Sequence, residues 1–355
     1  MGRPRDELFI DLAYSEVRRG VTLGCEVGKT MRVLSTAQRQ QFDEEGFVVV
    51  DDVLDPILDI GPVLAEYADV LDEIARELYA AGTIDSTFAD LPFPERLIHV
   101  CEAGGRVLPE TFDFSLPQSG IQHTTPIHVG PAVFDLLTSP RLLDLVEDVI
   151  GPEIYSNPVQ HIRMKLPKRA IPAGYTNGLV TQIPWHQDNG VILPEADEAT
   201  ILTVWLPLLD ATVANGCLQV IPHSHRGGIA THCPGGSLHI PDAMVPAERA
   251  RPLPMPPGSV LLMTQRTMHS SLDNVTDDQV RISMDLRYQP VGQPTGRPAF
   301  APAGFIARSK AHPEQVLADP SEWARRWLTL RDLLAEQAMA APMFNRWTAE
   351  AAVCA

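Results

Sequence analysis

A histidine and an aspartate stand two residues apart near the middle of the chain, within the run PWHQDN at residues 184–189. On an extended strand, residues i and i+2 face the same side. His186 and Asp188 are therefore expected to present a nitrogen and an oxygen atom to one metal ion. An isolated H-x-D triplet often arises by chance and usually marks only a solvated strand face. A metal site therefore requires a third ligand elsewhere in the chain.

The third ligand is expected from a distant segment that folds back beside the first. His269 is the best candidate, since it follows a predicted turn and buried strand with the sequence PGSVLLM at residues 257–263. Two histidines and one carboxylate form a facial triad that leaves adjacent coordination positions of ferrous iron open. An oxygenase needs such open positions.

An alternating strand is predicted to begin at Arg281 and to continue through Tyr288. One of its faces carries Arg281, Ser283, Asp285 and Arg287. A half-exposed strand often alternates in this way, but the polar face could also look into a barrel, where a guanidinium binds a carboxylate in bidentate fashion. Arg287 is expected either to pair with a carboxylate such as Asp285 or to bind an anionic part of a substrate.

The elements that must position these residues change type near residue 152. Before it, hydrophobic periodicity and capping residues predict helices at about 36–46, 56–81 and 131–150, with a strand at 47–50. After it, short runs bounded by Gly, Pro, Asn or Asp predict strands at 154–155, 159–166, 180–191, 200–207, 217–221, 260–264 and 280–289. Short strands without long helices between them favour a mainly β fold with flanking helices, such as a jelly roll.

We interpret residues 35–318 as a single domain whose N-terminal half is helical. Residues 1–34 form a predicted N-terminal extension. Residues 319–355 are predicted to contain a helix that packs on the domain or on a partner subunit, which is compatible with a homodimer. Two long loops, at 167–182 and 223–258, exceed the length of simple connections and are expected to be functional.

Bulk composition excludes several classes of partner. The formal net charge of −17 argues against nucleic acid or an anionic membrane as a partner, since both need a basic face. The five cysteines are scattered without a C-x-x-C pair, which predicts free thiols in a reducing compartment. Without an apolar signal segment or a long apolar run, a cytoplasmic protein is expected.

Five motifs occur in an order and spacing typical of a known family: His186-x-Asp188, NGCLQVIPHSH at 215–225, PGS at 257–259, His269 and Arg281. Together they resemble the phytanoyl-CoA dioxygenase-like family of iron(II)- and 2-oxoglutarate-dependent oxygenases. The runs GFVV at 46–49 and VIGP at 149–152 resemble its N-terminal half. The resemblance covers roughly residues 34–290 and implies a cupin-like double-stranded β-helix.

The resemblance implies that His186, Asp188 and His269 bind iron. It also implies that 2-oxoglutarate and dioxygen are cosubstrates. The expected reaction is hydroxylation or desaturation of an unactivated C–H bond in a small organic molecule, with secondary metabolites as one candidate class. Related halogenases carry a small residue at the position of Asp188, so a carboxylate there points to oxygenation.

The same resemblance assigns residues to the cosubstrate pocket. Arg281 would hold the distal carboxylate of 2-oxoglutarate. Further cosubstrate contacts are implied for Ser271, Gln160 and Trp205. Candidate substrate-pocket residues are Trp185, Asn189, Arg287 and His123.

Other interpretations remain open at this point. His223 and His225 form an H-x-H pair that could bind metal, although in this family the corresponding motif ends a strand structurally. The same iron ligands could serve a cupin-like isomerase or hydrolase that does not use 2-oxoglutarate. A ligand-binding relative without catalysis is a further alternative. Arg281 discriminates the oxygenase from the cupin-like alternative, because only the oxygenase uses 2-oxoglutarate, whereas iron-dependent succinate release would exclude the relative without catalysis.

Overall fold

The computed structural model describes residues 33–235, 237–337, 346–348 and 350–354. Most of the predicted N-terminal extension therefore lies outside the described residues. Within the described part of the chain, no helix is long and apolar enough to cross a membrane.

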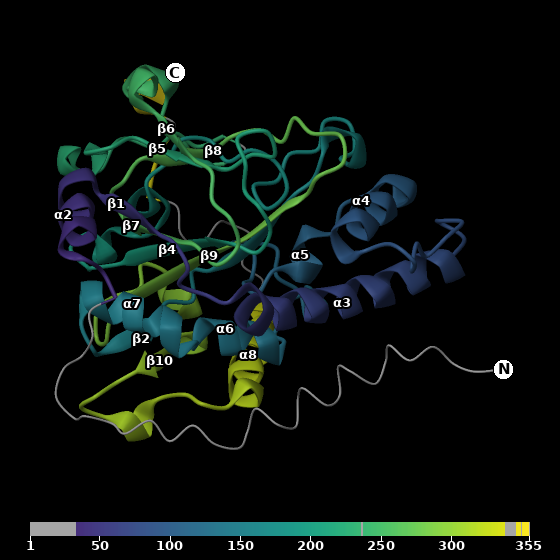
Figure 1. Ribbon diagram of the computed structural model, residues 1–355, viewed down its shortest axis with the longest axis horizontal. Coiled ribbons are helices and arrows are strands. Elements are labelled where there is room, and N and C mark those ends of the chain that lie inside the picture. Colours follow the sequence, from purple (N-terminus) through teal and green to yellow (C-terminus); the bar gives the residue numbers. More distant parts are fainter. Residues whose placement is uncertain (1–32, 236, 338–345, 349, 355) are drawn as a thin grey trace. The chain divides into compact units, whose positions relative to one another are not determined.

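Two antiparallel sheets form the centre of the fold (Figure 1). The larger sheet has the order β1 (Phe47–Val50), β7 (Val260–Thr264), β4 (Leu202–Pro207), β9 (Arg281–Pro290), β2 (Ile154–Ser156) and β10 (Phe305–Arg308), and β3 (His161–Lys165) also pairs with β9. The smaller sheet contains β6 (Arg251–Leu253), β5 (Leu218–Val220) and β8 (His269–Ser271). This architecture confirms the predicted double-stranded β-helix with flanking helices.

The period of two along β9 decides which side chains enter the barrel. Ile282, Met284, Leu286 and Tyr288 belong to the core on the helical side of the sheet. The alternate residues, from Arg281 to Arg287, therefore face inward, and all are buried. Strand β4 follows the same rule, with Val204 in the helical core and Trp205 in a second core that includes residues of the smaller sheet. Of the two interpretations of the alternation in β9, the structure therefore shows the one in which the polar face looks into the barrel.

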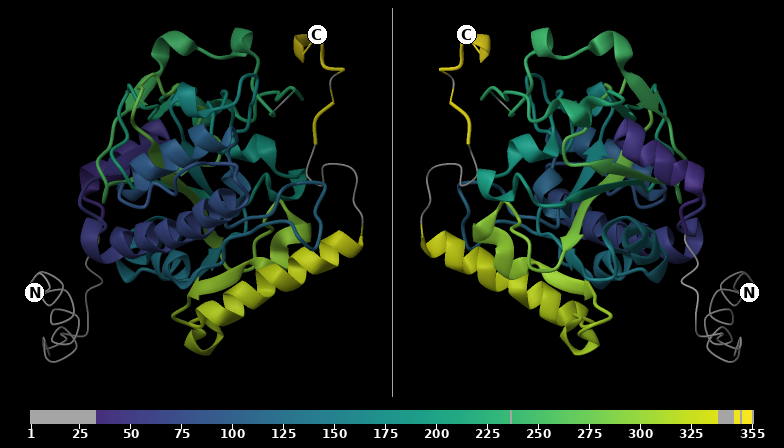
Figure 2. Two further views of the ribbon diagram at one scale, coloured as in Figure 1. Left: turned by 90° about the vertical axis from the view of Figure 1, so that its right-hand side faces the viewer. Right: turned by 90° about the vertical axis from the view of Figure 1, so that its left-hand side faces the viewer.

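Helices pack on the outer face of the larger sheet (Figures 1 and 2). They are α3 (Gly61–Ala80), α4 (Phe93–Gly104), α5 (Pro109–Phe112), α6 (Pro131–Leu137), α7 (Pro140–Ile150) and α8 (Pro320–Glu336). Asp319 caps the start of helix α8. In the core of the same chain, Trp323 packs against Phe134 and Trp327 packs against Phe300. A homodimer stays a prediction.

Helix α2 (Thr36–Glu45) leads directly into β1. Ser35 and Gln38 form a capping box, and Gly46 ends the helix with a left-handed φ of 85°. The C-terminal glycine turns the chain so that Phe47 enters the sheet opposite Met263.

Several predicted elements differ from the structure. The helix predicted at 131–150 is interrupted at Ser139-Pro140, because a proline inside a helix removes a backbone donor and clashes with the preceding turn. The segment 56–81 begins with one π-helical turn, Pro56–Ile60. The segment 82–130, for which no helix or strand was predicted, contains α4 and α5.

The strand predicted at 180–191 was wrong. His186 makes only an isolated antiparallel bridge to His269, and Asp188 begins a 3-10 turn, η3 (Asp188–Val191). Pro184 lacks a backbone N–H, which removes one donor that a strand needs. The two ligands therefore do not share one face of a regular strand.

The prediction of free thiols was also wrong for two cysteines. Cys233 and Cys354 form a disulfide, with their Cα atoms 5.4 Å apart and 121 residues between them in sequence. Sequence spacing gives no information on proximity at such separations. Cys101 and Cys217 are buried free thiols. The cytoplasmic location stays a prediction, which the cysteine pattern no longer supports.

Candidate metal centre

Three buried side chains converge between the two sheets. Ligand atoms of His186, Asp188 and His269 all lie within 4.8 Å of one another. Reciprocal backbone hydrogen bonds of 3.0 Å join His186 to His269 and place their rings 4.1 Å apart. The triad expected from the sequence is thus brought together in space, although His186 makes only an isolated bridge and Asp188 begins a 3-10 turn.

Backbone carbonyls fix the orientation of both imidazoles. The Nδ1 atom of His186 lies 2.9 Å from the Pro184 carbonyl oxygen, and that of His269 lies 3.0 Å from the Thr267 carbonyl oxygen. A carbonyl can only accept, so each Nδ1 carries the proton and each Nε2 is free to bind metal. Burial, with His269 as the next cause, lowers the pKa of His186 to about 3, so the ring is neutral as a metal ligand must be.

The carboxylate of Asp188 is held from two sides. Arg287 donates to Oδ1, and the Thr203 hydroxyl donates to Oδ2. Burial alone favours the neutral acid, but the Arg287 guanidinium, followed by the two histidines, holds the pKa of Asp188 well below its usual range. The expected pairing of Arg287 with a carboxylate is therefore confirmed, both with Asp188 and, at 3.5 Å, with Asp285. Its contact with a candidate metal ligand was not predicted.

A small enclosed space adjoins the triad on the inner side. It is lined by nine residues that include His186, His269, Trp205 and Ser270, and its volume of about 10 Å³ is about that of one water molecule. The Trp205 indole N–H is buried and has no acceptor among the described residues. An incoming ligand with an acceptor oxygen would satisfy this donor.

Two cations lie beyond Trp205. The Arg281 guanidinium lies 5.7 Å from the centre of the Trp205 ring and donates to the Gly216 carbonyl at 3.2 Å. Lys165 pairs with Arg281 in the β3–β9 register and donates from Nζ to the Ser271 hydroxyl at 2.6 Å. Burial lowers the pKa of Arg281 to about 9 and that of Lys165 to about 6. Arg281 and Ser271 were predicted here, whereas Lys165 was not.

The family profile described as Phytanoyl-CoA dioxygenase (PhyH) matches residues 42–283. The chain belongs to this family. It is therefore an oxidoreductase of the iron(II)- and 2-oxoglutarate-dependent class, with dioxygen as the usual second cosubstrate.

Curated relatives agree with the family assignment, and a solved structure agrees with the fold. The chain is 32% identical over 181 residues to 1-deoxypentalenic acid 11-beta-hydroxylase from Streptomyces arenae, covering 47% of this chain and 60% of that protein. It is 27% identical over 269 residues to the enzyme of the same name from Streptomyces exfoliatus, covering 71% of this chain and 91% of that protein. The solved structure of a non-heme monooxygenase, ThoJ in its apo form, matches with a TM-score of 0.52 at 17% identity, covering 84% of this chain and 97% of that chain, and supports the fold alone.

The residues present fit the cofactors of the family. Two imidazole nitrogens and one carboxylate oxygen form a donor set that suits ferrous iron. On the inner side, the unsatisfied indole N–H of Trp205 and the basic side chains of Arg281 and Lys165 are complementary to a dicarboxylate. The small inner space is too small for 2-oxoglutarate, so side chains must move when this dicarboxylate enters.

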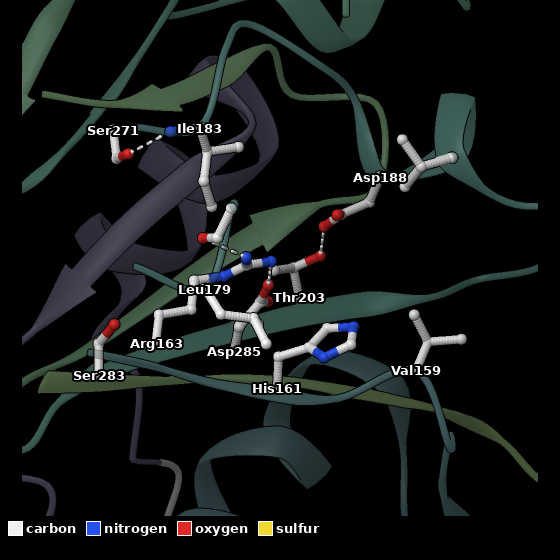
Figure 3. A network of polar contacts seen from close by, with 12 residues as sticks. Val159, His161, Arg163, Leu179, Ile183, Asp188, Thr203, Ser271, Ser283 and Asp285 are labelled. Carbon is white, nitrogen blue, oxygen red and sulfur yellow. Dashed lines mark hydrogen bonds and ion pairs between the residues drawn. The ribbon is translucent and has the colours of Figure 1, made fainter. Parts of the chain in front are cut away.

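His186 also lines a larger cavity of about 440 Å³, which shares Arg163 and Ile183 with the small inner space. Its charged and polar lining includes His161, Arg163, Arg287, Arg297, Gln118 and Asn177, and the loops around 177–179 and 234–238 complete it. Arg163 lines both cavities and donates to Asp285 at 2.9 Å and to the Gly178 carbonyl at 3.0 Å, as Figure 3 shows beside Asp188 and Thr203. The two predicted functional loops thus contribute to this cavity.

Not all predicted pocket residues reach these cavities. His123 was wrongly placed, because its side chain is 61% exposed at the surface beside Asp332. Trp185 packs with the apolar cluster around Ile240. Asn189 is buried and donates to Asp197 at 2.9 Å. Neither residue is among those that line the two cavities.

Gln160 is likewise engaged elsewhere. Its amide nitrogen donates to the Ser156 hydroxyl at 2.7 Å and to the Asn157 carbonyl at 2.6 Å. Its contact with 2-oxoglutarate stays a prediction that these hydrogen bonds do not favour. His223 bonds to the Glu44 carbonyl at 2.7 Å, and His225 lies against Gly46, which agrees with a structural role for the H-x-H pair.

Proposed function

We propose that this protein hydroxylates an unactivated C–H bond of a small organic acid. The observation that carries the proposal is the position of His186, which borders both the inner space and the larger cavity. Iron bound by His186, Asp188 and His269 would therefore meet a cosubstrate on one side and a substrate on the other. When bound, iron with 2-oxoglutarate supplies the dioxygen chemistry that breaks the C–H bond.

The chain's own residues have distinct tasks in this reaction. Arg281 and Lys165 bind the distal carboxylate of 2-oxoglutarate, and Trp205 donates to an oxygen of the same molecule. Arg287 and Thr203 hold the Asp188 carboxylate in place for iron. The walls of the larger cavity hold the substrate carbon close to the metal and exclude water, which protects the reaction from side paths.

The charge of the larger cavity supports an acidic substrate. Its lining includes three guanidinium groups, from Arg163, Arg287 and Arg297, and the planar guanidinium matches a carboxylate. Arg163 and Arg287 already pair with Asp285 and Asp188, so a substrate carboxylate would share these two arginines with them. The two Streptomyces relatives are named for an acid that they hydroxylate. A carboxylate bound at the arginines would orient an apolar body toward the iron.

The test measures succinate release by the iron-loaded protein with 2-oxoglutarate and a panel of cyclic and terpenoid acids, each paired with its methyl ester. We expect an acid to stimulate release, with a KM at least tenfold lower than that of its ester, because a hydrogen bond to a charged group contributes about 1.5–3 kcal/mol. Equal KM values for acid and ester would reject the acidic substrate.

The variant Arg281→Ala tests the use of 2-oxoglutarate separately, with Arg281→Lys as its conservative control. Loss of succinate release in Arg281→Ala with partial recovery in Arg281→Lys supports the oxygenase. Turnover that continues without 2-oxoglutarate would instead indicate a metal-dependent isomerase or hydrolase.

A further inference from the structure

The C-terminal segment beyond residue 345 lies outside the part of the chain that the family profile matches. Arg346 forms an ion pair with Asp197, with Nη2 2.8 Å from Oδ2. Trp347 donates from its indole nitrogen to the Gly190 carbonyl at 2.6 Å. Cys354 is joined to Cys233 by the disulfide. In Figure 2 this yellow segment is drawn beside the β core, apart from α8.

These contacts reach the backbone that carries the iron ligands. Gly190 lies in the same 3-10 turn as Asp188, two residues away. Asp197, the partner of Arg346, also accepts from the Asn189 amide at 2.9 Å. Trp347 thus contacts the turn of Asp188 directly, at Gly190, and Arg346 reaches the same turn through Asp197, which accepts from Asn189.

A buried histidine connects Trp347 to the residue between the two ligands. The Trp347 ring stacks on His232, with centroids 5.4 Å apart and an interplanar angle of 26°. His232 is fully buried, and its Nε2 accepts the backbone N–H of Gln187 at 2.9 Å. A methyl group at Gly190 would overlap the His232 ring, so the glycine permits this close packing. The turn is therefore packed against His232 and, through the stacked rings, against Trp347.

The disulfide connects the same segment to the wall of the larger cavity. Cys233 pairs with His239 through two backbone hydrogen bonds, of 2.7 and 3.2 Å. Between these two residues, Pro234, Gly235 and Leu238 line the cavity. One covalent bond thus fixes the C-terminal segment to the base of a loop that contacts the substrate space.

We propose that Trp347 and Arg346 are positioning residues for the iron-binding turn, and that the Cys233–Cys354 disulfide holds them against it. The inference rests on the proposed iron site. The indole N–H fixes the Gly190 carbonyl, and the stack on His232 fixes the Gln187 N–H. Together these contacts set the direction from which the Asp188 carboxylate approaches the metal. Residues that orient metal ligands in this way typically contribute 10–100-fold to metal affinity.

The experiment titrates the full-length protein with Co(II) under anaerobic conditions and records the dissociation constant and the ligand-field spectrum. We expect Trp347→Ala to raise the Kd for Co(II) by about tenfold or more and to alter the spectrum. Trp347→Phe, which keeps an aromatic ring on His232 but loses the N–H, should fall between Trp347→Ala and the wild type. Arg346→Met is expected to raise the Kd less, because Asn189 still contacts Asp197.

Trp327 offers a matched control, since it is a buried tryptophan of α8 that packs on Phe300 away from the metal ligands. Trp327→Phe and Trp327→Ala should lower the unfolding midpoint without changing the Co(II) spectrum. If Trp347→Phe and Trp347→Ala leave the Kd and the spectrum unchanged, or if the Trp327 variants alter them equally, the inference is wrong. A wild-type protein that binds no Co(II) would instead reject the proposed iron site itself.

The disulfide is tested by reduction with a trialkylphosphine, which is removed before the titration. The disulfide takes up two electrons and two protons to give two thiols, and the phosphine becomes a phosphine oxide with the oxygen of water. Reduction should weaken Co(II) binding severalfold, Cys354→Ser should reproduce that loss, and reduction should not weaken Cys354→Ser further. An unchanged Kd in both the reduced protein and Cys354→Ser would show that the disulfide does not hold the positioning residues.

Discussion

At the scale of single residues, the side chain of Asp188 is held by partners on both of its carboxylate oxygens. Its two carboxylate oxygens accept from Arg287 and from Thr203, and one of them must also bind the metal. The cost of burying a charge is offset only when every partner is in place. Arg287, at the inner face of β9, is therefore expected to act first on metal binding and only secondarily on the substrate.

Arg287→Gln should weaken Co(II) binding by about 10–100-fold, because it removes the group that keeps the carboxylate ionised and oriented. Arg297→Gln is the control, since Arg297 lines the same cavity. We expect Arg297→Gln to raise the KM for an acidic substrate while leaving the Kd for Co(II) unchanged. Equal metal affinities in Arg287→Gln and the wild type would contradict the role of Arg287.

Lys165 gives 2-oxoglutarate binding a pH dependence. Burial, followed by the charge of Arg281, lowers its pKa to about 6, while Asp273 and Cys217 act in the opposite direction. A bound carboxylate would raise this pKa, so binding is coupled to proton uptake. Affinity for 2-oxoglutarate is therefore highest near and below pH 6 and falls by up to tenfold per pH unit above it, until the pH exceeds the pKa of the bound form.

Isothermal titration of the metal-loaded protein across pH 6–9 measures this dependence. Lys165→Met should bind 2-oxoglutarate more weakly at pH 6 and lose most of the pH dependence. In the cosubstrate-free protein, the lowered pKa of Lys165 costs stability below pH 10.5 that is recovered as the pH rises, so Lys165→Met should be at least as stable as the wild type at pH 7. An affinity that is independent of pH would rule out the proton uptake.

At the scale of secondary-structure elements, periodicity was reliable where a strand is long. The alternation from Arg281 onward correctly predicted an inward polar face, because β9 is ten residues long and buried on both sides. The same signal exists in β3, where His161, Arg163 and Lys165 alternate with apolar residues. This pattern alone does not predict an inward polar face, because β3 has only five residues and its basic side chains are equally compatible with solvent.

Other elements could not be predicted from local sequence. The candidate iron ligands could be predicted because their residue types and their order in the sequence are distinctive. The 3-10 turn at Asp188 could not, because it depends on tertiary contacts with His232 and Trp347. The disulfide joins residues 121 positions apart, and no local pattern encodes such a contact. The residues that could bind the metal were therefore predictable from the sequence, whereas the residues that pack against them and hold them in place were not.

Gly46, which links α2 to β1, allows a test of element geometry. Its φ of 85° is unfavourable for a residue with a side chain, and an added methyl group would overlap His225 and Thr267. Gly46→Ala should therefore destabilise the protein by about 2–4 kcal/mol, combining the left-handed penalty with overpacking. Urea unfolding measures the loss.

Gly82 is the matched control for this substitution. Its φ is also positive, at 68°, but no heavy atom lies within 4 Å of an added methyl group. Gly82→Ala should lose only the conformational part, about 1–2 kcal/mol. Similar losses in both variants would mean that the contacts of Gly46 with the H-x-H segment add nothing to stability.

At the scale of the whole molecule, the metal would connect the two sheets. His269 belongs to β8 of the smaller sheet, whereas Asp188 is held by Thr203 of β4 and Arg287 of β9 in the larger one. A ligand that binds only the folded state stabilises it by mass action. Because the bound ion spans both sheets, this stabilisation should extend to global unfolding and not only to the local turn.

Co(II) at one hundred times its Kd should therefore stabilise the protein by about 2.7 kcal/mol, which corresponds to an unfolding midpoint several degrees higher. His269→Ala removes the ligand from the smaller sheet and should abolish most of the shift. His239→Ala, which changes a histidine outside the triad, should keep it. Differential scanning calorimetry with and without Co(II) measures all three proteins. A shift of the same size in His269→Ala would mean that the ion binds elsewhere, since only a site that includes His269 couples the smaller sheet to the larger one.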